Sequence, residues 1–82
     1  MNAISISEII KRCGGSIAMA AHYATLPEAH KRSLTPSGIR WWQVKGCGIP
    51  HYHYRWVADR AGISISEVHA ANEALWAEKE MR

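Results

Sequence analysis

The segment from Leu34 to Gly46 constrains the fold most, because it reads as one short helix with a marker at each end. Thr35 is a favourable N-cap residue, and Pro36 suits the first helical position, where a backbone N–H has no partner anyway. Gly46 can close the helix in a left-handed conformation. The segment therefore predicts a helix over 35–45 whose limits are set by its own residues.

The two faces of this helix differ in chemistry. Ile39 and Trp42 are three residues apart and share one face, which we expect to be buried. The opposite face is formed by Ser37, Arg40, Trp41, Val44 and Lys45. A helix that buries one face and presents hydroxyl, guanidinium, indole and ammonium groups on the other suits the major groove of DNA.

The pentapeptide Ile-Ser-Ile-Ser-Glu occurs twice, at 4–8 and at 63–67. In each copy the first Ser and the Glu three residues later can form a capping box, and the preceding Ile can pack against the fourth helical position. The copies predict two helix starts, at Ser5 and at Ser64. The first helix should end near Cys13, and the second should continue to about residue 80.

Two further helices follow from similar signals. Ser16 is expected to cap a helix that ends near Tyr23, and Pro50 should begin another that stops at Gly62. The segment 25–34 is either one helical turn or a loop. No useful length of strand-like alternation occurs, so we expect an all-α fold of about five short helices in a single domain, 1–82.

Charge and composition narrow the function classes. Residues 1–60 carry eight Lys and Arg against three Asp and Glu, which favours a polyanionic partner, whereas residues 61–82 are net acidic. No apolar run is long enough to span a bilayer, and no secretory signal is visible, so a cytoplasmic protein with two free thiols is expected. Paired carboxylates, a glycine-rich phosphate loop and a nucleophile elbow are all missing, so we expect no enzyme and no cofactor.

Several motifs occur in a familiar order and spacing. They are Cys13-Gly14-Gly15 followed by Ala18-Met19-Ala20, then Thr35-Pro36-x-x-Ile39-x-x-Trp42, then Gly48-Ile49-Pro50, and finally Tyr54-x-x-Val57-x-x-x-Ala61-Gly62-Ile63-Ser64. Over about residues 6–68 the chain resembles the Cro/repressor-type helix-turn-helix family, and it is most similar to small YdaS-like (Cro-like) regulators of phages and toxin–antitoxin loci. The resemblance implies a lambda-repressor-like core with a supporting helix over 16–23 and a recognition helix over 36–45.

The chain departs from the family pattern between these two helices. The family turn is usually a few residues long, whereas here Thr25–Leu34 intervenes. The insertion adds Lys31 and Arg32, which can reach phosphate. An alternative register would begin the recognition helix at Pro27, with Glu28, His30 and Lys31 facing DNA, but it leaves no Trp at the core position of the motif.

The candidate DNA-binding residues fall into two groups. Arg40 is the first choice for reading a base, since an Arg in the groove can contact guanine with two hydrogen bonds, and Ser37, Trp41 and Val44 accompany it. The candidates for phosphate contact are Ser16 at a helix start, Arg12, Lys31, Arg32 and Lys45.

A second kind of surface is expected to bind protein. Its candidate residues are the aromatic pair Tyr52 and Trp56 and the stripe of the last helix, Val68, Ala71 and Leu75 with Trp76 beside it. We expect the last helix to hold two copies together. Cys47, His51 and His53 match no standard zinc spacing, so no metal is expected.

These observations predict a sequence-specific double-stranded DNA-binding transcriptional regulator, a repressor that binds its operator as a homodimer. The alternative is a protein-interaction module, antitoxin-like or from a phage regulatory system, whose main ligand is another protein.

Overall fold

The structure is a computed structural model that describes residues 4–30, 32–44 and 48–80. The regular secondary structure of this part of the chain consists of α-helices and short 3₁₀ turns, so the predicted all-α class is confirmed. The α-helices are α1 (Ile6–Arg12), α2 (Ser16–Tyr23), α3 (Pro36–Val44), α4 (Tyr54–Ala61) and α5 (Ile65–Glu80). The 3₁₀ turns are η1 (Pro27–His30) and η2 (His51–His53).

Three of the helices begin where the sequence places them. The side-chain oxygen of each predicted N-cap residue accepts a hydrogen bond from the backbone N–H three positions ahead, at 3.1 Å for Ser5, 3.0 Å for Thr35 and 3.1 Å for Ser64. Each bond satisfies one of the N–H groups that a helix start leaves without a partner. Pro36 occupies the first position of α3, as predicted.

The end of α4 is also as predicted. Gly62 follows the helix with φ 73°, and the N–H of Ile63 reaches back to the carbonyl of Ala58 at 3.0 Å. This six-to-one hydrogen bond is the Schellman ending of a helix. Gly46, the predicted end of the helix over 35–45, lies outside the described residues.

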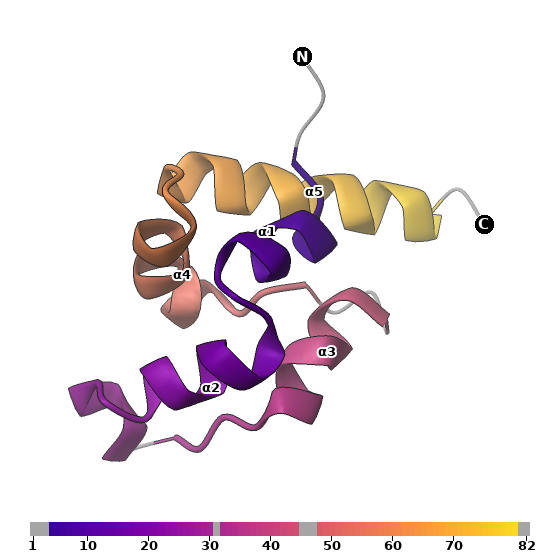
Figure 1. Cartoon of the computed structure of the whole chain (residues 1–82). Helices are drawn as coiled ribbons and strands as arrows, with labels where there is room; N and C mark the ends of the chain where they lie inside the picture. Colours follow the sequence, from indigo (N-terminus) through magenta and orange to yellow (C-terminus); the bar gives the residue numbers. More distant parts are fainter. Residues whose placement is uncertain (1–3, 31, 45–47, 81–82) are drawn as a thin grey trace.

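The helices pack as two pairs joined by a central helix (Figure 1). α2 packs against α3, and α4 packs against α5. α1 lies between the pairs and contacts all four of these helices. Every helix therefore shares one core, and each of them supplies at least one almost fully buried side chain: Ile9, Met19, Ile39, Val57 and Val68, with Ile49 from the connection between α3 and α4.

The inserted segment contains one short turn. η1 spans only Pro27–His30 and has 3₁₀ geometry. The alternative register with a recognition helix beginning at Pro27 is therefore wrong, because one 3₁₀ turn is too short to lie along a groove. None of the helices in the described ranges combines the length and hydrophobicity that a bilayer-spanning segment needs.

Candidate nucleic-acid interface

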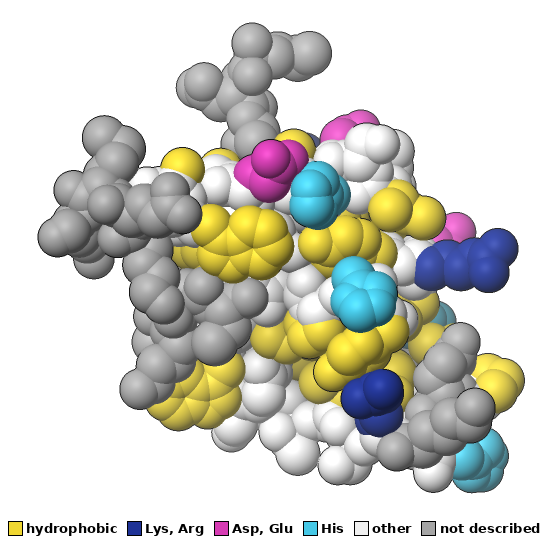
Figure 2. All heavy atoms as spheres, turned by 180° about the vertical axis from the view of Figure 1, so that it is seen from behind, with side chains coloured by type: hydrophobic (Ala, Val, Ile, Leu, Met, Phe, Trp, Pro, Cys, Tyr) yellow, Lys and Arg dark blue, Asp and Glu magenta, His cyan; other side chains and the backbone are white. Residues whose placement is uncertain are grey.

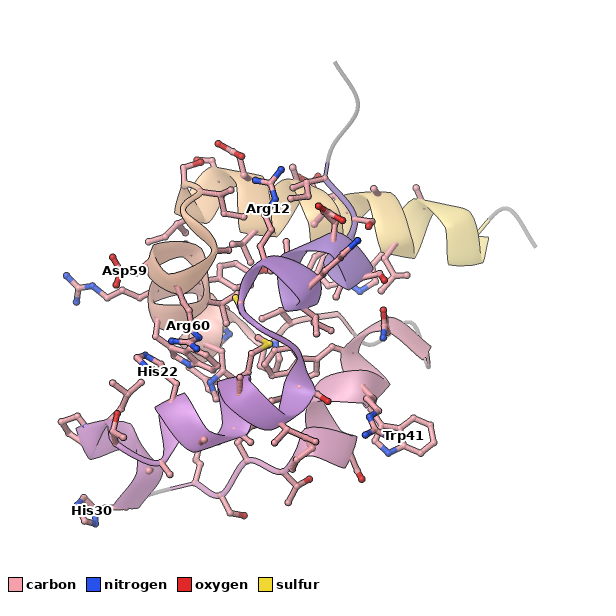
Figure 3. All side chains as sticks on the ribbon, in the orientation of Figure 1. Arg12, His22, His30, Trp41, Asp59 and Arg60 are labelled. Atoms are coloured by element: carbon pink, nitrogen blue, oxygen red, sulfur yellow. The ribbon has the colours of Figure 1, made fainter. Side chains whose placement is uncertain are left out.

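The exposed face of α3 carries the leading candidates from the sequence. Ile39 and Trp42 are buried, with exposed fractions of 0% and 5%, and they fix the inner face of the helix as predicted. Ser37 and Arg40 are exposed, and Trp41 exposes 47% of its surface. Figure 3 shows Trp41 projecting away from the body of the molecule. α3 thus has one side in the core and a polar and aromatic side facing solvent.

The start of α2 lies beside this face. The Nε of Arg40 donates a hydrogen bond to the Oγ of Ser16 at 3.4 Å, although the two residues are 24 positions apart. Arg40 has five N–H donors, so this contact leaves the two terminal nitrogens of its guanidinium for another acceptor. The contact places a base-reading candidate and a phosphate-binding candidate on one surface.

The prediction that Ser16 caps α2 is wrong. The N-cap is Gly15, which has φ 97°, and Ser16 is the first helical residue. A residue with a Cβ rarely adopts this φ, so the backbone path out of α1 selects glycine at the cap. α2 has no side-chain hydrogen bond at its cap. The first backbone N–H groups of a helix can donate hydrogen bonds to an anion.

The remaining basic candidates do not all gather at this surface. Arg12 pairs with Glu8 at 3.6 Å on α1, and Figure 3 shows it on the side of the molecule near α5, well separated from Trp41. The guanidinium carbon of Arg32 lies 4.1 Å from the ring centroid of Tyr52. Lys31, Lys45 and the side chain of Val44 lie outside the described part of the chain.

The predicted partner surface on α5 is largely wrong. Val68 and Ala71 are buried in the chain's own core, with exposed fractions of 0% and 2%, and Leu75 packs against that core. The apolar stripe is real, but α1 and α4 already cover it, so it cannot face a second copy. Trp76, beside the stripe, is 38% exposed.

The two residues of the predicted aromatic pair, Tyr52 and Trp56, differ in how far they are buried. Tyr52 is exposed, whereas Trp56 packs against the core and donates a hydrogen bond from its indole to Nδ1 of buried His53 at 2.9 Å. Trp56 is therefore partly buried, so of the predicted pair only Tyr52 is fully available to a partner. Figure 2 shows hydrophobic side chains, with histidines among them, gathered in a band across the face behind the view of Figure 1.

Asn72 is a residue that sequence reasoning missed. Its buried side-chain amide accepts from the N–H of Ile49 at 2.8 Å and donates to the carbonyl of Ile49 at 2.8 Å and to the hydroxyl of Tyr54 at 2.7 Å. These bonds tie Ile49, in the connection between α3 and α4, and Tyr54, at the start of α4, to α5. The sequence contains one indication of this role: Asn72 is an uncharged polar residue directly after Ala71 in the apolar stripe of the last helix.

Gly48 allows this close approach. It has φ 78°, and a Cβ at this position would lie 2.8 Å from the side-chain oxygen of Asn72. Any larger residue at position 48 would therefore both strain the backbone and press on Asn72.

A side chain of α4 holds the turn between α1 and α2 by a hydrogen bond. The Nε of Arg60 donates to the carbonyl of Cys13 at 2.9 Å, and this bond satisfies a carbonyl at the end of α1. Cys13 is buried and forms no disulfide. Its thiol pKa is raised, because the effect of burial outweighs the lowering by the nearby charge of Arg60. Burial therefore disfavours the reactive thiolate.

No metal-binding group emerges in the described ranges: no cluster of three or more His, Cys, Asp or Glu is close enough to hold an ion. Cys47 lies outside those ranges. Comparison of the chain with protein-family models, curated proteins and solved structures gives no match.

Proposed function

We propose that the chain is a sequence-specific double-stranded DNA-binding transcriptional regulator that acts as a repressor by occupying its operator as a homodimer. The observation that carries this proposal is the composite surface at α3, where Ser37, Arg40 and Trp41 are exposed and Arg40 contacts the start of α2. The helix-turn-helix resemblance, with its phage and toxin–antitoxin regulators, supports the same assignment.

Each residue of this surface has a specific role in the proposal. Arg40 reads a guanine through its two terminal nitrogens while its Nε stays bonded to Ser16. Ser37, in the first turn of α3, contacts a neighbouring base, and Trp41 packs against a thymine methyl group or sugars. The N–H groups at the start of α2 bind a phosphate, and Lys31 and Lys45 add sequence-independent affinity.

Substitution of two basic residues tests the roles separately. Selection from a random duplex library first defines the preferred site. Arg40→Ala should then cost about 1–3 kcal/mol on that site and relax the preference at one base pair, because it removes a base contact. Lys45→Ala should weaken binding to all sequences alike and reduce the salt slope by about one.

Lys11→Ala is the matched control, because Lys11 is an exposed cation at the end of α1 and belongs to neither group. It should leave specificity unchanged. Equal loss from Arg40→Ala and Lys45→Ala across the whole library would contradict the assignment of Arg40 to base reading.

The protein-interaction module is the second candidate, and the exposed aromatic residues Tyr52 and Trp76 outside the α3 face favour it. The two functions differ in their response to random duplex DNA. A DNA-binding protein binds such DNA weakly, with an affinity that falls steeply as salt rises. A module specific for protein shows no such binding.

A further inference from the structure

A groove of about 520 Å³ opens beside α4, apart from the exposed face of α3. Its lining includes Tyr52, Arg55, Trp56 and Asp59 from η2 and α4, and Ile63 and Ile65 where α5 begins. None of Ser37, Arg40 and Trp41 lines it.

The apolar lining of the groove includes two exposed side chains. Tyr52 and Ile65 expose 47% and 50% of their surfaces and stand at this groove, where Trp56 and Ile63 are partly buried. Exposed apolar side chains that gather around one groove with charged residues beside them favour binding of another surface there. Since the stripe of α5 is used inside the chain, this groove is the better surface for association.

Two side chains of opposite charge, Arg55 and Asp59, line the groove. Arg55 and Asp59 are four residues apart on α4, yet among the described residues neither forms an ion pair. Glu8 and Arg12 on α1, at the same spacing in the opposite order, do pair at 3.6 Å. In α4 the cation precedes the anion, and this order gives a weaker ion pair within a helix than the reverse order. It also places Arg55 near the positive end of the helix dipole and Asp59 near the negative end.

We propose that this groove binds a second copy of the chain, with the two α4 helices antiparallel across a twofold axis. In this arrangement Arg55 of each copy meets Asp59 of the other, and each charge comes close to the end of the partner helix that favours it. The projecting side chains at the rim, Ile65 and Tyr52, enter the groove of the other copy beside Trp56. The groove is complementary to itself in both charge and apolar surface.

This pairing leaves the exposed face of α3 free. Figure 3 shows Asp59 and Trp41 on opposite sides of the molecule. The use of the pair in binding a twofold operator rests on the proposed function. The association itself is tested without DNA, so the two proposals can fail separately.

The test is sedimentation equilibrium of the full chain and of two charge variants. Arg55→Asp places two carboxylates against each other across the axis, and Asp59→Arg places two guanidinium groups against each other. Each variant alone should dimerise at least roughly tenfold more weakly than the wild type. An equimolar mixture should regain association, because each substituted side chain then meets a complementary charge.

Lys11→Asp makes the same change of charge as Arg55→Asp at an exposed position of α1 outside the groove, and it should leave the dimerisation constant unchanged. Circular dichroism confirms that every variant is folded. Ile65→Lys should also weaken the dimer, because it places a charge in the apolar part of the groove. A wild type that remains monomeric up to millimolar concentration would overturn the proposal, as would a wild-type dimer whose two charge variants fail to associate when mixed.

Discussion

The same five residues begin α1 and α5, yet the two copies end in different environments. In both, the Ser cap accepts a hydrogen bond from the Glu N–H at 3.1 Å. The second Ile of each copy differs: Ile6 exposes 3% of its surface and Ile65 exposes 50%. Local sequence fixes where a helix begins, and the surrounding helices decide which of its residues are buried.

The cause of the difference is position in the fold. α1 lies between the two helix pairs and contacts the other four helices, so its apolar residues are enclosed. α5 begins at the edge of the molecule, beside the groove that Ile65 helps to line. An identical residue is thus part of the core at one site and part of an available surface at the other.

The adjacent residues Trp41 and Trp42 give the largest expected effect of this kind. Trp42→Ala should destabilise the fold by about 3–5 kcal/mol, because it empties a buried site against His53. Trp41→Ala should change the free energy of unfolding by about 0.5 kcal/mol or less, since its side chain is half exposed. Urea denaturation measures both, and the reverse ranking would mean that α3 is rotated.

The two isoleucines make the comparison in identical peptides. Ile6→Ala should cost about 2–5 kcal/mol, because a buried cavity remains. Ile65→Ala should change the stability of the monomer by about 0.5 kcal/mol or less. Both are measured by denaturation at a concentration below that of dimer formation. Equal losses would show that the start of α5 is enclosed as fully as that of α1.

The N-cap serines of the two copies should behave alike, in contrast to the two isoleucines. Ser5→Ala and Ser64→Ala should each cost about 1 kcal/mol, because each removes the hydrogen bond from the Glu N–H at an exposed helix start. Ser64 also donates to the exposed Glu67 carboxylate at 3.3 Å, a contact that adds little to the loss. Thermal unfolding measures both losses. A large difference between them would show that the surroundings, and not only the local sequence, determine the value of the cap.

The features predicted correctly from the sequence depend on neighbouring residues. Ser5, Thr35 and Ser64 mark helix starts, and Gly62 marks an end, through hydrogen bonds that span a few positions. The period of the apolar residues also identifies the buried face of α3. Such local rules are enough for the all-α class and for the exposed candidates on that helix.

The missed features depend on contacts between distant residues. Asn72 bonds to Ile49, 23 positions away, and no local pattern announces such a bond. The stripe Val68–Ala71 shows that α5 has an apolar face, but not that α1 and α4 cover it. Gly15, and not Ser16, is the N-cap of α2, because the backbone between α1 and α2 has a positive φ at this position. A pattern of side chains does not show this backbone conformation.

The four tryptophans provide the most direct test that the exposed face of α3 binds DNA, because the structure places them in different environments. Trp41 lies on that face, Trp42 in the core, Trp56 at the groove beside α4, and Trp76 on α5. Isotope-labelled protein is titrated with duplex DNA at low salt while the four indole N–H signals are followed by NMR. We expect the Trp41 signal to shift most, and added salt to reverse the change. Shifts at Trp56 or Trp76 with Trp41 unchanged, or no shift with any duplex, would contradict it.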